Sequence, residues 1–260
     1  MSYLPYLFSF VYGSAIGSFV NVLVSRLNVA PVLNARSKCL TCGNKIAWYD
    51  LIPFVSYIIL QGRCRNCKVK FGIENLLMEV FYGVIFILTY KFILIGGSLL
   101  AGLLWLLFYS IFFVTLGVIS FYDLKHKLLP VNFFLGFLIL CLFVLFFRFF
   151  GSSDLSLTIL LSPIIVSFPF LFLWLISKGK WLGFGDVLMY MAVGAFFSVE
   201  QGVAVFLLSV FLGALTGVIL ILLKGYKFGR SIPFIPFITL AMIIVLFTDI
   251  DIYSIIKIFG

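Results

Sequence analysis

Charged residues are scarce in this 260-residue chain, and acidic ones are the scarcest. Only 10% of the residues are charged, and just 9 of them are Asp or Glu. Soluble domains carry about 25% charged residues, so the composition excludes an ordinary aqueous globule. The chain also lacks an internal repeat with a period of 20–50 residues, which excludes a solenoid or propeller. His126 is the only histidine and has no Ser or Cys partner at a triad-like position, so it is either an interfacial basic residue or a proton shuttle.

Apolar residues fill most of the chain, at 64% of the total. They occur in runs of about 20 residues, the length that an α-helix needs to cross the hydrocarbon core of a bilayer. We therefore predict an all-α polytopic membrane protein, a bundle of about eight transmembrane helices with a cytoplasmic zinc-binding loop. The first apolar run has no basic segment before it and is interpreted as a retained anchor. The predicted helices cover approximately residues 3–25, 75–95, 98–121, 129–150, 157–177, 186–199, 201–223 and 232–250.

The net charge is +9, and the basic residues are divided unequally between the two predicted sides of the membrane. If the N-terminus lies outside, the cytoplasmic connections hold all but Lys91, Arg148 and Lys257 of the 18 basic residues. This asymmetry follows the positive-inside rule, so the charge indicates topology and contact with anionic lipids, not nucleic-acid binding. The one long connection, from Arg26 to Glu74, is then cytoplasmic.

Four cysteines in that connection form two CxxC pairs, "CLTC" at 39–42 and "CRNC" at 64–67. This spacing is typical of a zinc site in which Cys39, Cys42, Cys64 and Cys67 supply four thiolates. Two disulfides or a redox role are the alternatives, but disulfides rarely persist in a reducing cytoplasm. A site closed by four thiolates has no open coordination position, which predicts a structural ion. Cys141 lies in an apolar helix and is predicted to be a packing residue.

Two aspartates lie at predicted cytoplasmic helix ends: Asp123 in "FYDLKHKLLP" and Asp186 in "GFGD". Ionisable groups at a membrane are expensive and indicate function. Two carboxyl groups a few ångströms apart share one proton, so one can activate water while the other polarises a peptide carbonyl. Gly183 and Gly185 are expected to allow a tight, open turn beside Asp186. The alternative is that both aspartates are solvated loop residues or helix N-caps.

The remaining acidic residues are assigned simpler roles. We expect Asp50 to lie in a turn, and Glu74 and Glu79 to interact favourably with the N-terminal dipole of their helix. Solvated positions on the outer face are predicted for Asp154, Glu200, Asp249 and Asp251.

These motifs together resemble the type IV prepilin peptidases, and the resemblance covers nearly the whole chain. "GSFVNVLVSRL" at 17–27 is similar to the first segment of that family. "SKCLTCGNKIAWYDLIPFVSY" and "QGRCRNC" are similar to its zinc-loop signature, and Glu79 falls where the family has a glutamate. "DLKHKLLP" is similar to the first catalytic motif, and "GFGD" matches the GxGD motif that presenilin-like proteases share. Two positions depart from the family pattern: Leu188, where Lys is frequent, and Ile235, where Gly is common in the late IPFxPF motif.

The resemblance implies a bifunctional enzyme of the bacterial cytoplasmic (inner) membrane with its active site facing the cytoplasm. Such enzymes remove the basic leader of type IV prepilins or pseudopilins and methylate the new N-terminus with S-adenosylmethionine. Asp123 and Asp186 would be the proteolytic pair, and the cysteine loop would serve methylation. This divides the chain into a first helix (1–26), a zinc loop (27–74) and a peptidase bundle (75–260). No motif indicates which residues bind S-adenosylmethionine, and oligomeric state is not predicted.

Two other functions fit parts of the sequence. One is a peptidase without methyl transfer, which the complete set of four cysteines argues against. The other is a non-catalytic membrane scaffold or transporter, which has little support because few charged residues lie within the predicted spans.

Overall fold

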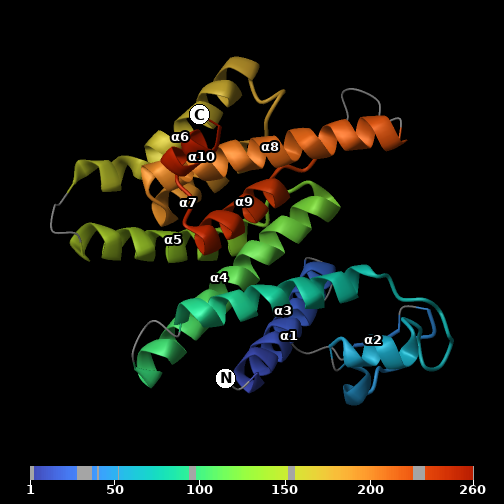
Figure 1. Ribbon diagram of the computed structural model, residues 1–260. Helices are drawn as coiled ribbons and strands as arrows, with labels where there is room; N and C mark the ends of the chain where they lie inside the picture. The colour runs from blue at the N-terminus through green and yellow to red at the C-terminus, as the bar shows by residue number, and fades with distance from the viewer. Residues whose placement is uncertain are drawn as a thin grey trace. The chain divides into compact units, whose positions relative to one another are not determined.

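The computed structural model describes residues 3–27, 37–39, 41–51, 53–93, 98–151, 156–224 and 232–259. Most of these residues are helical, and the extended segments among them form only isolated β-bridges (Figure 1). It divides into two compact units, Met1–Val114 and Thr115–Gly260. Asp154, to which a solvated position was assigned above, lies outside the described residues, as do Arg36, Lys227 and Arg230 of the predicted cytoplasmic connections.

The helices alternate with short connections, apart from the cysteine loop. The first unit holds α1 (Leu4–Arg26), the 3-10 helix η1 (Trp48–Leu51), α2 (Val55–Leu60) and α3 (Glu74–Ile93), and α4 (Leu99–His126) continues from this unit into the second. The second unit holds α5 (Val131–Gly151), α6 (Leu157–Ser177), α7 (Phe184–Phe196), α8 (Val199–Lys224), α9 (Ile235–Thr248) and α10 (Ile252–Phe259).

All eight predicted apolar segments are helices, which confirms an all-helical multi-pass membrane protein. Five of them, α1, α4, α5, α6 and α8, are long and apolar enough to cross a membrane. Helices α7 and α9 have 13 and 14 residues. At 1.5 Å per residue each is about 20 Å long, shorter than a hydrocarbon core of about 30 Å. The number eight is therefore not confirmed.

In the first unit α1 and α3 pack with their backbones almost in contact, because glycines lie at the interface. A Cβ atom on Gly17 would lie 2.6 Å from the carbonyl oxygen of Met78, and one on Gly13 would lie 2.4 Å from that of Tyr82. Small residues four positions apart allow this close approach between helices in lipid, where packing replaces the hydrophobic effect as the driving force. The cysteine loop follows α1 and precedes α3, so this contact fixes the two ends of the loop.

In the second unit the short helix α7 is the centre of the packing. It contacts α5, α6, α8 and α9, and eight of its residues are buried (Figure 1). The Tyr190 ring stacks on Phe170 of α6 with 4.0 Å between ring centroids. At the far end of α7, Arg148 donates to the carbonyl of Phe197 at 2.6 Å and so pairs a carbonyl group that the helix end leaves without an intrahelical partner. This environment holds α7 in place although it is too short to span.

The ends of two helices differ from the prediction at the aspartates. Helix α4 continues past residue 121 to His126, so Asp123 lies within its last turn. The helix stops where Lys127 adopts a left-handed conformation, with φ 54°. Helix α7 begins at Phe184, two residues earlier than predicted, so Asp186 lies in its first turn. Both aspartates are thus on helices and not in flexible loops.

The α1–α3 contact predicts a steric effect on stability. Gly17→Val should lower the free energy of unfolding by about 1–3 kcal/mol or more, because the new side chain meets backbone that cannot move aside. Gly136→Val on α5 is the matched control, since a Cβ there meets nothing within 4 Å. Thermal unfolding of the full-length protein in detergent measures both, and equal melting temperatures would refute the packing described here.

Candidate functional site

The two CxxC segments fold into the same backbone motif. In the first, the Cys39 N–H donates to the carbonyl of Asn44 and the Gly43 N–H donates to the carbonyl of Cys39, each at 2.9 Å. In the second, Cys64 and Lys68 repeat both bonds, with Val69 as the acceptor of the first at 2.9 Å. An antiparallel bridge flanks each knuckle, Lys38 to Lys45 and Arg63 to Lys70. The two knuckles are therefore equivalent ligand hairpins.

Each knuckle turns at the residue after its second cysteine, in the left-handed region. Gly43 has φ 70° and Lys68 has φ 57°. Glycine adopts this conformation without steric cost, whereas a lysine is strained in it. The turn aims both cysteines of a knuckle to one side.

The four thiols meet at one point. The sulfur atoms of Cys39, Cys42, Cys64 and Cys67 all lie within 4.8 Å of one another. Four sulfurs at about 2.3 Å from a tetrahedral ion are separated by about 3.8 Å, and Cys39 Sγ lies 3.7 Å from Cys67 Sγ. All five cysteines of the chain are free thiols, and Cys141 is buried away from the cluster in α5. The arrangement could hold one metal ion and is not a pair of disulfides.

The electrostatics of the cluster favour a cation. The backbone N–H groups of Cys42 and Thr41 bond the Cys39 sulfur and lower the pKa of that thiol to about 6. At Cys67 the Val69 N–H lowers the pKa, but desolvation and the neighbouring thiols outweigh it and raise the pKa to about 11. Four clustered thiols cannot all ionise by themselves, whereas a bound metal ion stabilises them all as thiolates.

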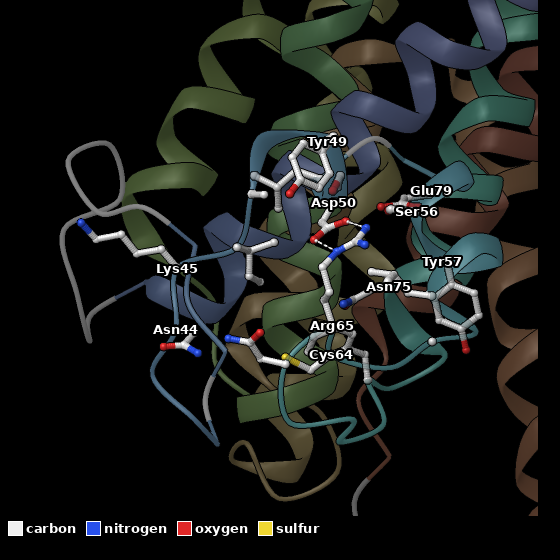
Figure 2. Close-up of a pocket in the computed structure, with 18 residues that line it drawn as sticks. Asn44, Lys45, Tyr49, Asp50, Ser56, Tyr57, Cys64, Arg65, Asn75 and Glu79 are labelled. Atoms are coloured by element: carbon white, nitrogen blue, oxygen red, sulfur yellow. Dashed lines mark hydrogen bonds and ion pairs between the residues drawn. The ribbon is translucent and has the colours of Figure 1, made fainter.

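An ion pair joins the second knuckle to the segment between the knuckles. Arg65 donates to both carboxylate oxygens of Asp50, at 2.6 and 3.0 Å, and its guanidinium lies 5.3 Å from the centre of the Tyr49 ring (Figure 2). The hydrogen bonds from Arg65 hold the pKa of Asp50 below its usual value. The sequence predicted only a turn at Asp50, because a partner 15 residues away leaves no local signal.

Glu79 is the sixth residue of α3 and therefore lies beyond the first turn, where the helix dipole acts most strongly. Its side chain is buried and accepts the backbone N–H of Phe54 at 2.8 Å. Phe54 has φ 63°, a strained value for a side chain of this size. Glu79 therefore fixes the cysteine loop to α3, a role that helix-dipole reasoning missed.

Asp123 is buried in the second unit, with 7% of its surface exposed. Its carboxylate receives the backbone N–H of Ile235, the first residue of α9, and the charge of Lys127 also acts on it. Its other oxygen, Oδ2, is buried and has no hydrogen-bond partner among the described residues. A helix N-terminus thus faces Asp123, and one carboxylate oxygen is left to bind a further group. Only the backbone of Ile235 makes this contact, so it does not depend on the glycine that is common there.

Asp186 is half-buried at the third position of α7, and the charge of Asp123 acts on it. Its Oδ2 accepts the Gly183 N–H at 3.2 Å, which closes a cap around the start of the helix. Asp186 is therefore not the N-cap residue of α7, which is Gly183, but its side chain closes the start of the helix and it also lies near Asp123. Asp123, in contrast, lies in the last turn of α4 and caps no following helix. Leu188, two residues after Asp186 on α7, is half-buried.

The GFGD glycines form no unusual backbone turn, although they leave the open space that was expected beside Asp186. Gly183 has φ −73° and ψ 145°, an extended conformation open to any residue, and Gly185 is helical. What the glycines provide is space: a Cβ on Gly183 would lie 3.4 Å from the Asp186 carboxylate, and one on Gly185 would lie 3.5 Å from Leu129. The absence of side chains leaves the approach to Asp186 uncovered, without an unusual turn.

The other polar candidates make contacts of their own. His126 is exposed and its ring packs 4.4 Å from that of Tyr122, between ring centroids. Asp249 accepts a hydrogen bond from Gln201, and Asp251 accepts the Ser254 N–H at 2.8 Å at the start of α10.

Comparison with known proteins matches both units of the chain. Residues 11–93 match the bacterial peptidase A24 N-terminal domain, and residues 110–218 match the type IV leader peptidase family. A prepilin leader peptidase/N-methyltransferase of Vibrio cholerae is 31% identical over 75% of this chain and 78% of its own length. Proteins of the same name are 28% identical in Pseudomonas aeruginosa (88% of this chain, 85% of the relative) and 27% in Myxococcus xanthus (86% and 65%).

No solved structure matches the chain. The family match and the Vibrio relative agree with the resemblance drawn from the ordered motifs. The chain belongs to the type IV leader peptidase family.

Proposed function

We propose that this protein is a membrane aspartic endopeptidase that removes the leader of type IV prepilins or pseudopilins and then methylates the new N-terminus. The observation that carries the peptidase half is the proximity of Asp123 and Asp186, one in the last turn of α4 and one in the first turn of α7. Relatives of this chain carry the name prepilin leader peptidase/N-methyltransferase, which supports both halves.

The surroundings of the two aspartates suggest different roles for them. The Ile235 N–H at the start of α9 donates to the Asp123 carboxylate and the charge of Lys127 also acts on it, whereas the charge of Asp123 acts on Asp186. Asp123 is then the base: its unpartnered Oδ2 takes a proton from the attacking water. Asp186 carries the shared proton and donates a hydrogen bond to the carbonyl oxygen of the scissile peptide. Water oxygen bonds to the carbonyl carbon, the C–N bond breaks, and the leaving amine takes a proton.

Methyl transfer is assigned to the cysteine loop. When bound, S-adenosylmethionine would supply an electrophilic methyl group to the new N-terminal amine, with the thioether as leaving group and the amine proton passing to solvent. The four thiols suit zinc, which accepts four sulfur ligands in tetrahedral geometry. With no open position, this ion would fold the loop and take no part in the chemistry. Residues 1–26 would then be an anchor, 27–74 the methyl-transfer loop and 75–260 the peptidase bundle.

The proposed location is the bacterial inner membrane, with both sites facing the cytoplasm. The distribution of basic residues supports this orientation through the positive-inside rule. Substrate leaders would approach along the anionic lipid surface to which the basic loops are also attracted.

The aspartate pair predicts loss of cleavage in either single variant. Asp123→Asn and Asp186→Asn should each lower the rate of leader cleavage by at least about 100-fold, the scale of general acid–base catalysis. Asp249→Asn is the control. Asp249 lies outside the site and has a left-handed backbone conformation, φ 53°, which asparagine also tolerates. Cleavage of a precursor peptide by purified protein is followed by mass spectrometry. Retained cleavage in Asp123→Asn or Asp186→Asn would falsify the assignment.

The cysteine cluster predicts one zinc ion per chain. Elemental analysis of the purified protein should find about one equivalent of zinc, as expected for a four-thiolate site. Cys39→Ser should lose it, while Cys141→Ser, which alters a buried cysteine outside the cluster, should retain it. Zinc present at full stoichiometry in Cys39→Ser would place the ion elsewhere.

The two activities should separate between the two units. A Cys39→Ser/Cys42→Ser variant should still cleave the precursor, because the aspartates belong to the second unit, but should leave the new N-terminus unmethylated. Asp123→Asn should fail to cleave the precursor but should still methylate a peptide that already lacks its leader. Mass spectrometry of the product N-terminus reads both, and methylation by the double cysteine variant would contradict the division.

A further inference from the structure

A cavity of about 320 Å³ lies in the first unit, beside the second cysteine knuckle. Small-molecule sites measure about 300–1,000 Å³, so its size suits a nucleoside-sized ligand. Side chains of the cysteine loop, α1 and α3 line it, and Figure 2 shows the Tyr49 ring, the Asp50–Arg65 pair and Asn75 gathered around one space. All of these groups belong to Met1–Val114.

Two carboxylates line the cavity, and they differ in their partners. Asp50 is bound by Arg65 and is therefore neutralised. Glu79 receives hydrogen bonds from the Phe54 N–H and from Ser18, yet it takes part in no ion pair within the described ranges. A buried carboxylate without a cation is costly, so a positively charged group of a ligand would complete the site. Lys45 also lines the cavity, but Figure 2 shows its side chain extending away from the others.

The rest of the lining suits the other parts of an adenosyl ligand. The rings of Tyr49 and Tyr57 offer aromatic surface, which attracts cations and stacks on a purine. Asn44 and Asn75 offer amide donors and acceptors for a base edge or ribose hydroxyls. The Asn75 oxygen accepts a hydrogen bond from Asn21, which leaves the Asn75 NH₂ group to donate to a ligand.

The metal cluster and the cavity share a wall. Cys64 lines the cavity, and the next residue, Arg65, holds Asp50 and lies against Tyr49. The knuckle that carries Cys64 therefore sets the position of the ion pair that bounds the cavity. Loss of the metal would release this wall and the ligand site together.

We propose that this cavity is the S-adenosylmethionine site, with the carboxylate of Glu79 facing the sulfonium and the Tyr49–Asn75 side receiving the adenosine. The proposal rests on the methyl-transfer activity proposed above and names the residues that serve it. Nucleotides with phosphates fit poorly, because their charge would meet the Glu79 carboxylate. The cation on the sulfur is therefore the feature that the site selects.

The test compares two ligands that differ in that charge. S-adenosylmethionine and the neutral thioether S-adenosylhomocysteine are titrated calorimetrically into full-length wild-type protein, Glu79→Gln and Glu74→Gln. Glutamine keeps an oxygen to accept the Phe54 N–H, so Glu79→Gln should fold, which its thermal unfolding beside wild type checks. Glu74→Gln makes the same change one turn earlier on α3, at an exposed position outside the cavity.

Glu79→Gln should weaken S-adenosylmethionine binding about tenfold or more, since it removes one partner of a buried charge pair. Binding of S-adenosylhomocysteine should change much less, and Glu74→Gln should bind both ligands as wild type does. Unchanged S-adenosylmethionine binding by Glu79→Gln would overturn the proposal. If Glu79→Gln does not fold, the cavity assignment is tested on wild type instead, by ultraviolet cross-linking of labelled S-adenosylmethionine. Labelled peptides from 44–57 or 62–79 support the site, and label confined to other segments overturns it.

The same experiments separate this proposal from the function on which it rests. If wild type methylates a processed peptide while Glu79→Gln binds normally, only the cavity assignment fails. If wild type neither binds S-adenosylmethionine nor methylates the peptide, the methyl-transfer activity fails and the cavity assignment fails with it. Leader cleavage by the aspartates is independent of both results.

Discussion

The central constraint on this protein is the placement of two carboxyl groups within one apolar helical unit. Asp123 is buried, and its charge acts on Asp186. Such a pair is costly in a poorly solvated site, and the backbone offsets part of that cost. The N-terminus of α9 supplies the Ile235 N–H to Asp123, and the N-terminus of α7 supplies the Gly183 N–H to Asp186. Both helices are too short to span the membrane fully, so their termini can lie beside the carboxylates.

The packing of the second unit follows from that requirement. Helix α7 has to be held firmly although it is short, and it is surrounded by four helices and paired at its far end by Arg148. Tyr190, one turn after Asp186, stacks on Phe170 and bonds the Ser209 hydroxyl. Phe170 in turn contacts Phe234, the residue just before α9. A single aromatic cluster thus fixes the two helix termini that face the aspartates.

In the first unit the cysteine loop is ordered although its apolar side chains, such as Leu51, Ile58 and Ile59, are largely exposed. Two equivalent knuckles bring four thiols together, and the Asp50–Arg65 pair and Glu79 bind the loop to itself and to α3. These polar contacts hold the loop together, and several of their residues line the cavity.

Much of this organisation could be predicted from the sequence because its signals are local. Apolar runs indicated eight of the ten α-helices in the described residues, all but the short α2 and α10, and CxxC spacing indicated the thiol cluster. Helix ends were less certain, since nothing before Lys127 breaks α4 and the extent of α7 depends on its cap. The partners of Asp50 and Glu79 could not be predicted, because each contact joins segments that are distant along the chain. The GFGD glycines were predicted in part: the open space beside Asp186 is present, but Gly183 is extended and Gly185 helical, so there is no unusual turn.

Whether Asp123 and Asp186 act as one unit is tested most directly by a double-mutant cycle on leader cleavage. If both carboxyl groups serve one transition state, removing the second after the first costs almost nothing. The Asp123→Asn/Asp186→Asn variant should then be about as slow as either single variant. A double variant slower by the product of the two single losses would show that the aspartates act independently, and would contradict a shared site.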